Sequence, residues 1–179
     1  MENTKRNDVE PWLRGTHGDL DAVTRQVVHA LELAGEDVDK WCAGLTDGEI
    51  NARPFGLPPV AFHLRHIARS LDRLLSYAEG TQLDATQRAA LRMELDEQAT
   101  FVEVMAEFKV ALHEAMKRVR ELSPEHFNAE RGVGRAALSS TVGGLLVHCA
   151  DHTQRHVGQA ITTAKLLLAM RGRGASADS

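Results

Sequence analysis

The stretch LLVHCADHTQRHVGQAITTAKLLLAM, which runs from Leu145 to Met170, predicts one long helix that carries three evenly spaced histidines. His148, His152 and His156 follow one another at four-residue steps, so on an α-helix they lie one turn apart and nearly in line. Apolar residues recur at helical spacing in the same stretch and mark its buried stripe: Leu145, Cys149, Ala160, Ala164 and Leu167.

These histidines are candidate metal ligands, because imidazole is the commonest metal-binding side chain. His148 and His156 are eight residues apart, about 12 Å along a helix axis, whereas a metal–nitrogen bond measures only about 2.1 Å. One adjacent pair must therefore be chosen. His156 falls near the centre of the apolar stripe, His152 toward its edge and His148 on its flank. We predict that His152 and His156 bind one ion, with a third ligand from another segment.

The composition favours a single cytoplasmic domain made of helices. The chain has 179 residues, of which 43% are hydrophobic and only 4% aromatic, and it is rich in helix-forming side chains. Its formal net charge of -4 and its few aromatic residues give no sign of nucleic-acid binding. Residues 1–14 do not resemble a signal peptide, and no apolar run is long enough to span a membrane.

Four amphipathic segments are separated by joints that contain proline and glycine. They are predicted at Asp19–Cys42, Pro59–Ala78, Gln98–Leu122, and from a cap at Ser139, Ser140 or Thr141 to about Met170. Residues 81–100 allow a short helix inside a long crossover, and residues 125–138 are expected to be a loop. Helices with one apolar face must bury it against one another, so we predict a four-helix bundle. The chain termini, about 1–14 and 171–179, are expected to be disordered.

The second predicted helix offers two histidines as the third ligand. By helical angle His63 lies closer to the apolar stripe, whereas His66 lies on its flank, beside Ser70. Each helix of a bundle meets two neighbours, so a flank also faces other helices. The helical pattern therefore leaves His63 and His66 both open. Cys149 remains a rival ligand because a thiolate binds zinc well, although burial as a small apolar side chain explains it more simply.

Two motifs resemble the DinB/YfiT-like superfamily of small bacterial helical proteins, from about Asp19 to Leu168. The first is HIARS, at residues 66–70, and the second is HTQRHVGQ, at residues 152–159, where Val157 stands at a position often held by arginine. The resemblance implies that His66, His152 and His156 bind a divalent metal such as nickel or zinc. It also implies a bundle with crossed helix order, a homodimer, and in some members metal-dependent thiol transfer or isomerisation.

The preferred hypothesis is a metal-dependent enzyme, a thiol S-transferase or a hydrolase acting on a small molecule. Peptide hydrolysis is disfavoured, because no carboxylate lies between His152 and His156 as it does in metalloprotease helices. The alternative is a dimeric bundle without enzymatic activity, whose metal is structural or regulatory. The sequence identifies no catalytic residue beyond the ligands.

We also interpret other residues near the proposed ligands. At least two of Arg69, Arg73 and Arg155 are expected to be solvated, and Gln159 is expected to orient a ligand. Gly143 and Gly144 are expected to permit a close helix approach. The Pro54–Pro59 connector and the Gly132–Arg135 loop are expected at the mouth of the pocket.

Overall fold

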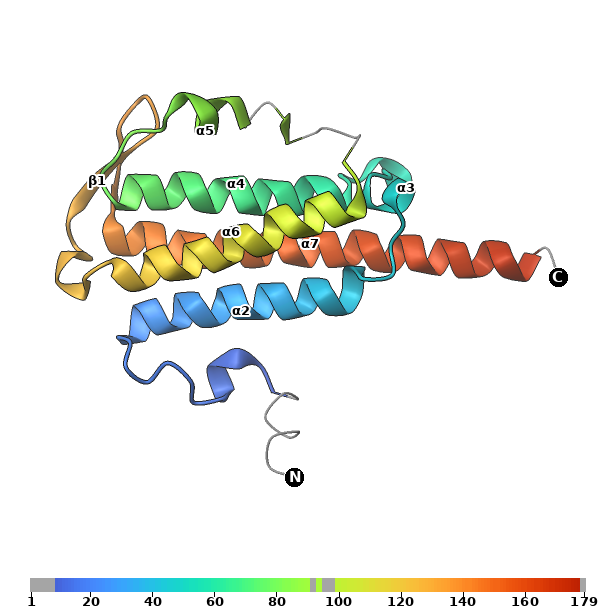
Figure 1. The fold of residues 1–179 in the computed structure, drawn as a ribbon, viewed down its shortest axis with the longest axis horizontal. Coiled ribbons are helices and arrows are strands. Elements are labelled where there is room, and N and C mark those ends of the chain that lie inside the picture. The colour runs from blue at the N-terminus through green and yellow to red at the C-terminus, as the bar shows by residue number, and fades with distance from the viewer. Residues whose placement is uncertain (1–8, 91–92, 95–98, 178–179) are drawn as a thin grey trace.

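Four long helices lie side by side and enclose one apolar core (Figure 1). The computed structural model describes residues 9–90, 93–94 and 99–177. The long helices are α2 (Ala22–Cys42), α4 (Val60–Ala78), α6 (Phe101–Glu121) and α7 (Val142–Ala177). Helices α2 and α4 each pack against both α6 and α7. The mostly helical fold predicted from the sequence is therefore confirmed.

Local sequence signals explain where these helices begin. The carboxylate of Asp21 accepts hydrogen bonds from the backbone N–H groups of Val23 and Thr24 and caps α2. Thr100 and Glu103 form a reciprocal capping box at the start of α6. Pro59 is the residue before α4, where its missing N–H costs no helical hydrogen bond.

Shorter elements connect the long helices. They are the 3₁₀ turns η1 (Pro11–Leu13), η2 (Pro54–Gly56) and η4 (Pro124–His126), the short helices α3 (Asp47–Ile50) and α5 (Ala85–Ala90), and the strands β1 (Glu130–Val133) and β2 (Leu138–Thr141). The short helix expected within residues 81–100 is thus present as α5, while residues 91–92 and 95–98 lie outside the described part. The connector at residues 54–59 contains the 3₁₀ turn η2.

The prediction of a loop at residues 125–138 was wrong in part, because a β-hairpin occupies much of this segment. Strands β1 and β2 pair antiparallel, with Glu130 opposite Thr141 and Val133 opposite Leu138. Four-residue strands carry too little alternation to stand out in the sequence. The hydroxyl of Thr141 accepts a hydrogen bond from Gly144 N–H at 3.0 Å, so the predicted cap does precede α7.

Within the described residues, the two terminal segments contain elements that were not expected, whereas residues 1–8 and 178–179 lie outside the described part. Helix α7 runs to Ala177 rather than ending near Met170, and its C-terminal part extends past the ends of the other helices (Figure 1). Near the N-terminus, η1 packs against α2. Within the described residues, none of the helices combines the length and apolar character needed to cross a bilayer.

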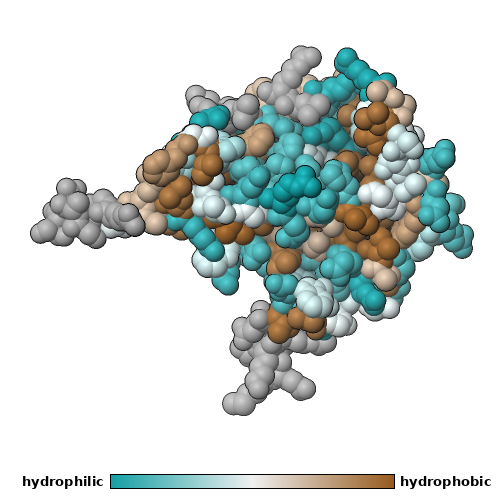
Figure 2. Space-filling view, turned by 180° about the vertical axis from the view of Figure 1, so that it is seen from behind, coloured by the Kyte–Doolittle hydropathy of each residue, from teal (hydrophilic) through white to brown (hydrophobic). Residues whose placement is uncertain are grey.

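The core is formed by fully buried apolar side chains from all four long helices. Representative members are Leu31, Leu64, Ile67, Phe108 and Leu146, each with no exposed area. On the face opposite to that of Figure 1, hydrophilic residues cover the centre and hydrophobic residues gather in several separate patches (Figure 2).

Candidate metal centre

Helices α4 and α7 bring three imidazoles together at their contact. His66 lies on α4, and His152 and His156 lie one turn apart on α7. His66 Nε2 is 3.2 Å from His152 Nε2, and one ring nitrogen of each of the three residues lies within 4.8 Å of the others. The ring centroid of His156 is 4.5 Å from that of His66 and 4.6 Å from that of His152. The residues named by the resemblance therefore lie in one cluster.

The spacing and chemistry of these donors suit a divalent transition metal. Two nitrogens bound to one ion at about 2.1 Å lie about 3.0 Å apart at a right angle and about 3.4 Å apart at the tetrahedral angle. The separation of 3.2 Å between the Nε2 atoms of His66 and His152 lies between these values. All three side chains are partly buried, so the cluster remains accessible to an ion and to a small molecule.

Glu94 holds the His66 ring from the side opposite to the cluster. Its carboxylate accepts a hydrogen bond from His66 Nδ1 at 2.8 Å, which leaves Nε2 of His66 with a free lone pair. Arg73 Nη1 donates to the other oxygen of Glu94 at 3.0 Å. Burial raises the pKa of Glu94, but the hydrogen bonds from His66 and Arg73 outweigh it and the pKa is lowered overall. Glu94 therefore stays ionised and fixes the tautomer of His66.

His63 contacts the cluster through His156. Nδ1 of His63 lies 3.0 Å from Nδ1 of His156, and the His63 side chain is only 3% exposed. Burial, together with the charges of His156 and His66, lowers the pKa of His63 to about 4, so it is neutral at pH 7. A His156 that coordinates through Nε2 carries its proton on Nδ1 and donates it to His63. Of the two histidines left open by the sequence, His66 joins the cluster and His63 supports it.

His152 and His156, the two cluster histidines on α7, are also held neutral. Burial and the neighbouring imidazoles lower the pKa of His152 to about 4. Burial, followed by the charge of His66, lowers the pKa of His156. Metal binding requires the unprotonated imidazole, so these shifts keep lone pairs available at neutral pH.

Phe62 packs against several of these rings. It is stacked on His66 with centroids 5.4 Å apart, and its edge faces His63 and His156. Neither Phe62 nor Glu94 was predicted as part of the site from the sequence. Phe62 is one turn before His66 on the same helix, which was a usable signal. Glu94 lies in a segment without helical periodicity, and nothing in its local sequence marks it.

A cavity of about 360 Å³ lies beside the cluster. Its lining includes His63, Arg155, Gln159 and two residues of the connector, Leu57 and Pro58. The expectation that the Pro54–Pro59 connector borders a pocket is therefore confirmed for those two residues. Arg155 and Gln159 are exposed and present a guanidinium and an amide to this space.

The arginines near the cluster and His148 differ in how far they are exposed to solvent. The prediction that at least two of the three arginines are solvated was wrong, because Arg69 donates to Glu107 at 2.7 Å and Arg73 pairs with Glu94. Only Arg155 is well exposed, at 57% of its side chain. His148 is 45% exposed and pairs with Asp151, as expected of a helix-surface histidine.

Cys149 does not reach the cluster. It is fully buried in the apolar core, and burial raises the pKa of its thiol to about 12. The thiol is therefore protonated at neutral pH and makes a poor rival ligand. Gly143 does permit a close approach, but to Phe127, the residue that follows η4, rather than to another helix. A Cβ at this position would lie 3.2 Å from the Cβ and backbone oxygen of Phe127.

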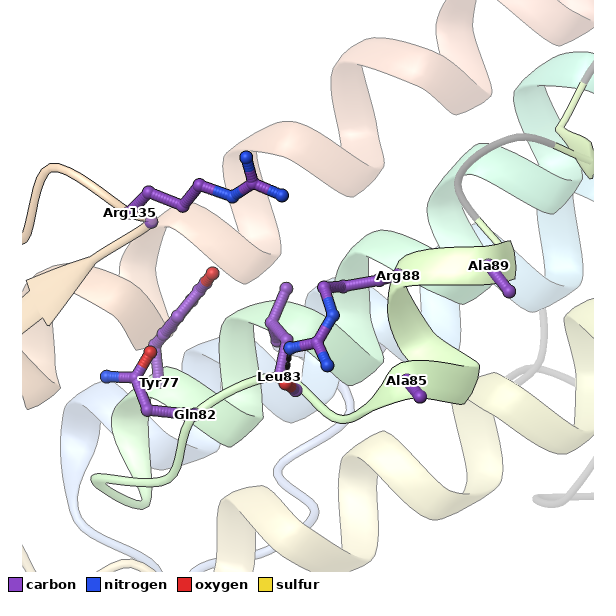
Figure 3. A pocket seen from close by; sticks show the side chains of 8 residues that line it. Tyr77, Gln82, Leu83, Ala85, Arg88, Ala89 and Arg135 are labelled. Carbon is purple, nitrogen blue, oxygen red and sulfur yellow. Dashed lines mark hydrogen bonds between the residues drawn. The ribbon is translucent and has the colours of Figure 1, made fainter.

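A larger cavity, of about 630 Å³, lies away from the histidines (Figure 3). It is enclosed by the end of α4, by α5 and by the turn of the hairpin, and Tyr77, Arg88 and Arg135 line it. The Gly132–Arg135 loop therefore contributes Gly134 and Arg135 to this cavity, and not to the mouth of the histidine site as expected. The cavity contains no metal-ligating cluster among the described residues.

With a mostly helical fold and a cluster of imidazoles between α4 and α7, the chain has the features of a small helical protein whose histidines could hold a metal ion. Residues 30–160 match the DinB superfamily, and the chain belongs to that superfamily. A conserved protein of Enterococcus faecalis has a similar structure, with a TM-score of 0.68 and 20% sequence identity over 84% of this chain and 99% of that one. Comparison with curated proteins finds no match.

Proposed function

We propose that the chain is a metal-dependent enzyme whose ion, nickel or zinc, is bound by His66, His152 and His156. The observation that carries this proposal is the convergence of three imidazoles from two helices, one of them fixed by a buried carboxylate. Three neutral protein ligands leave coordination positions open, which is typical of catalytic rather than structural sites. A bound ion of this kind lowers the pKa of a water or thiol and supplies a nucleophile near neutral pH.

The surrounding residues have separate tasks in this proposal. Glu94 keeps the proton of His66 on Nδ1, and His63 fixes the ring of His156. The guanidinium of Arg155 attracts an anionic group of a small substrate that enters the adjacent cavity, and the amide of Gln159 hydrogen-bonds to it. Leu57 and Pro58 form an apolar wall of the same cavity that reduces access of water.

Thiol S-transfer or hydrolysis of a small molecule is the reaction class that we infer. Between the two α7 ligands, Thr153 is buried and the Gln154 amide donates to Ala30 O at 2.7 Å. Glu94 is already held by His66 and Arg73. Thr153 and Gln154 carry no carboxylate, and the carboxylate of Glu94 is already engaged, so none of the three is available as the base of a peptidase. The proposal is therefore limited to small-molecule substrates.

Elemental analysis of protein purified without added metal tests the proposal. We expect about one nickel or zinc ion per chain at this centre, lost in His152→Ala and His156→Ala and retained in the surface variant His148→Ala. Transfer of a small thiol to an electrophile should then follow the metal content. Metal without any thiol transfer or hydrolysis would favour the non-enzymatic alternative. No stoichiometric metal, even after supplementation, would contradict the proposal.

The proposal also concerns the whole chain. We infer that the four long helices form one four-helix bundle with a crossover connection, which makes residues 1–179 a single domain. We further infer a cytoplasmic homodimer that does not bind nucleic acid. A sedimentation measurement tests the dimer, and a monomer at micromolar concentration would contradict that part alone.

A further inference from the structure

We propose that His17, His29 and Glu32 form a second divalent-metal site, which fastens the segment before α2 to that helix. One ligand atom from each of the three residues lies within 4.8 Å of the others. His29 and Glu32 are three residues apart on α2, so they occupy neighbouring positions on one face of the helix. His17 approaches from the preceding segment. The site shares no residue and no helix with the proposed centre between α4 and α7.

The backbone before α2 is held in an unusual conformation that presents His17. His17 has a φ of 55°, in the left-handed region that side chains with a Cβ seldom adopt. Gly15, two residues earlier, has a φ of 67°. Residues in this region commonly mark functional or ligand-binding positions, because the surrounding structure must offset the strain. Here the conformation brings His17 Nε2 to 2.7 Å from Glu32 Oε1.

The ligand chemistry suits a first-row transition metal. Two imidazoles and one carboxylate bind zinc in many catalytic sites, and the same set binds non-haem iron. The 2.7 Å between the atoms of His17 and Glu32 is somewhat shorter than the separation of about 3.0 Å expected for two ligands at a right angle around one ion. A small widening of this pair therefore admits the ion. The rings of His17 and His29 are tilted at 44° with centroids 5.4 Å apart.

Burial and hydrogen bonds prepare His29 for binding. Its side chain is only 4% exposed, and Thr16 Oγ1 lies 3.1 Å from its Nε2, which restricts rotation of the ring. Burial lowers the pKa of His29, so the imidazole is neutral at pH 7. His17 and Glu32 are 24% and 27% exposed, which leaves a route for an ion.

The charge of Arg14 acts on Glu32, while its guanidinium donates hydrogen bonds to the carboxylate of Glu36. Arg14 makes a two-pronged contact with Glu36, with Nη1 at 2.5 Å from one oxygen and Nη2 at 2.7 Å from the other. Glu32 Oε1 faces His17 Nε2 at 2.7 Å. A cavity of about 450 Å³ is lined by His17 and Glu32, together with His113, and has room for further coordinating water.

Zinc stoichiometry tests this site separately from the centre between α4 and α7. The protein is equilibrated with Zn²⁺, freed of loosely bound ions and analysed for zinc. We expect about two ions per chain in the wild type and about one in His17→Ala, in Glu32→Gln and in the double variant His152→Ala/His156→Ala. His113→Ala, which changes the same cavity but none of the three ligands, should keep both.

The outcomes separate the two proposals. If His17→Ala and Glu32→Gln hold as much zinc as His113→Ala, the second site is overturned. If the double variant holds as much zinc as the wild type, the first site fails while the second stands. His17 and Glu32 are partly exposed and Glu32→Gln preserves shape, so both variants are expected to fold.

Proteolysis provides a second readout, because the metal should restrain the segment before α2. Trypsin cleaves after Arg14, which lies close to His17 in the chain. Zinc at ten times its Kd should slow this cleavage about tenfold in the wild type and in His152→Ala/His156→Ala. The protection should be absent in His17→Ala and Glu32→Gln. Equal protection by zinc in all four proteins would overturn the role assigned to this site.

Discussion

Glu94 shows how one residue outside the regular pattern can define a site. It comes from the segment between α5 and α6, is only 8% exposed, and binds both His66 and Arg73. A buried carboxylate without partners is costly, whereas this one is fully engaged by two donors. Its contact with His66 selects the tautomer whose Nε2 faces His152.

Replacing Glu94 by glutamine should weaken metal binding at the proposed centre. The amide keeps the shape but loses the negative charge, so it no longer stabilises the coordinating His66 ring. We expect about a 10- to 100-fold loss of affinity for zinc or nickel, measured by competition with a chelator.

Glu107→Gln is the matched control for this change. Glu107 pairs with Arg69 and Arg65 on the same side of α4 but does not contact a histidine of the cluster. The affinity of Glu107→Gln for zinc or nickel should equal that of the wild type. Equal affinities in Glu94→Gln and the wild type would show that Glu94 does not support the ligand.

The ligand residues could be partly predicted from the sequence. The four-residue step between His152 and His156 placed them on one side of a helix. For the third ligand the apolar stripe favoured His63, and His63 is indeed the more buried residue, at 3% exposure. Burial was a poor criterion, because a ligand must face a gap between helices rather than the closed core. His66 lies at that gap, and only the family resemblance indicated it.

At the scale of elements, helices were predicted well and the hairpin was not. Long segments such as α6 show their period over several turns and end close to the predicted residues. Strands β1 and β2 span four residues each and depend on pairing with one another, which local sequence does not reveal. The hairpin turn contains Gly134, with a φ of 70°, and Ala137, whose φ of 47° is unusual for alanine and is not indicated by the residue type.

Gly158 offers a test of helix α7 itself. A Cβ added at Gly158 would meet no atom within 4 Å, so Gly158→Ala should gain helix propensity without a clash. We expect an increase of about 0.5–1 kcal/mol in the free energy of unfolding, measured by urea denaturation.

Gly143→Ala serves as the comparison in the same helix. Its Cβ would lie 3.2 Å from the backbone oxygen of Phe127, so the gain in propensity should be cancelled.

Gly158 also lines the cavity beside the histidines, so the added methyl group of Gly158→Ala should reduce turnover by filling space in that cavity. A Gly158→Ala protein that is no more stable than the wild type would show that this part of α7 is strained.

The contact between α7 and α3 predicts a pH dependence. Arg171 Nε donates to Glu49 Oε1 at 2.7 Å, and this hydrogen bond is the main cause that lowers the pKa of Glu49 to about 2. A carboxylate with a lowered pKa stabilises the folded state above its ordinary pKa of 4.5, and the effect is lost as the pH falls toward 2. Both side chains of the pair are partly exposed, Arg171 at 48% and Glu49 at 21%, so solvent screens the pair and the effect should be small.

We therefore expect Arg171→Ala to lower the urea midpoint at pH 6, with the difference from the wild type shrinking between pH 4.5 and pH 2. Arg120→Ala is a suitable control, because Arg120 contacts only the carbonyl oxygen of Met116 on its own helix among the hydrogen bonds observed in the described residues. A difference that stays constant over this pH range would exclude the Glu49 pair as its source.

At the scale of the whole molecule, the pairing of helices could not be read from one sequence. Each apolar stripe shows that a helix has a buried side, but not which neighbour covers it. In the structure α2 and α4 each contact α6 and α7, which places α4 and α7 side by side at the histidines. This arrangement depends on the sum of many side-chain contacts across the core.

The core also implies that the fold does not need the metal. Fully buried residues such as Leu31 on α2 and Phe108 on α6 belong to helices that contribute no ligand to the centre between α4 and α7. These helices hold α4 and α7 in position by packing alone. Metal removal should therefore leave the helical circular dichroism intact at room temperature.

The loss of thermal stability on metal removal should match mass action alone. At a free metal concentration of 100 times Kd, one site stabilises the folded state by about 2.7 kcal/mol, and a chelator removes this amount. The measurement is best made in Glu32→Gln, in which the centre between α4 and α7 is the remaining proposed metal site. The double variant Glu32→Gln/His156→Ala serves as a reference that no longer responds to metal. Loss of the helical signal on chelation would instead mean that the ion, and not the core, holds α4 against α7.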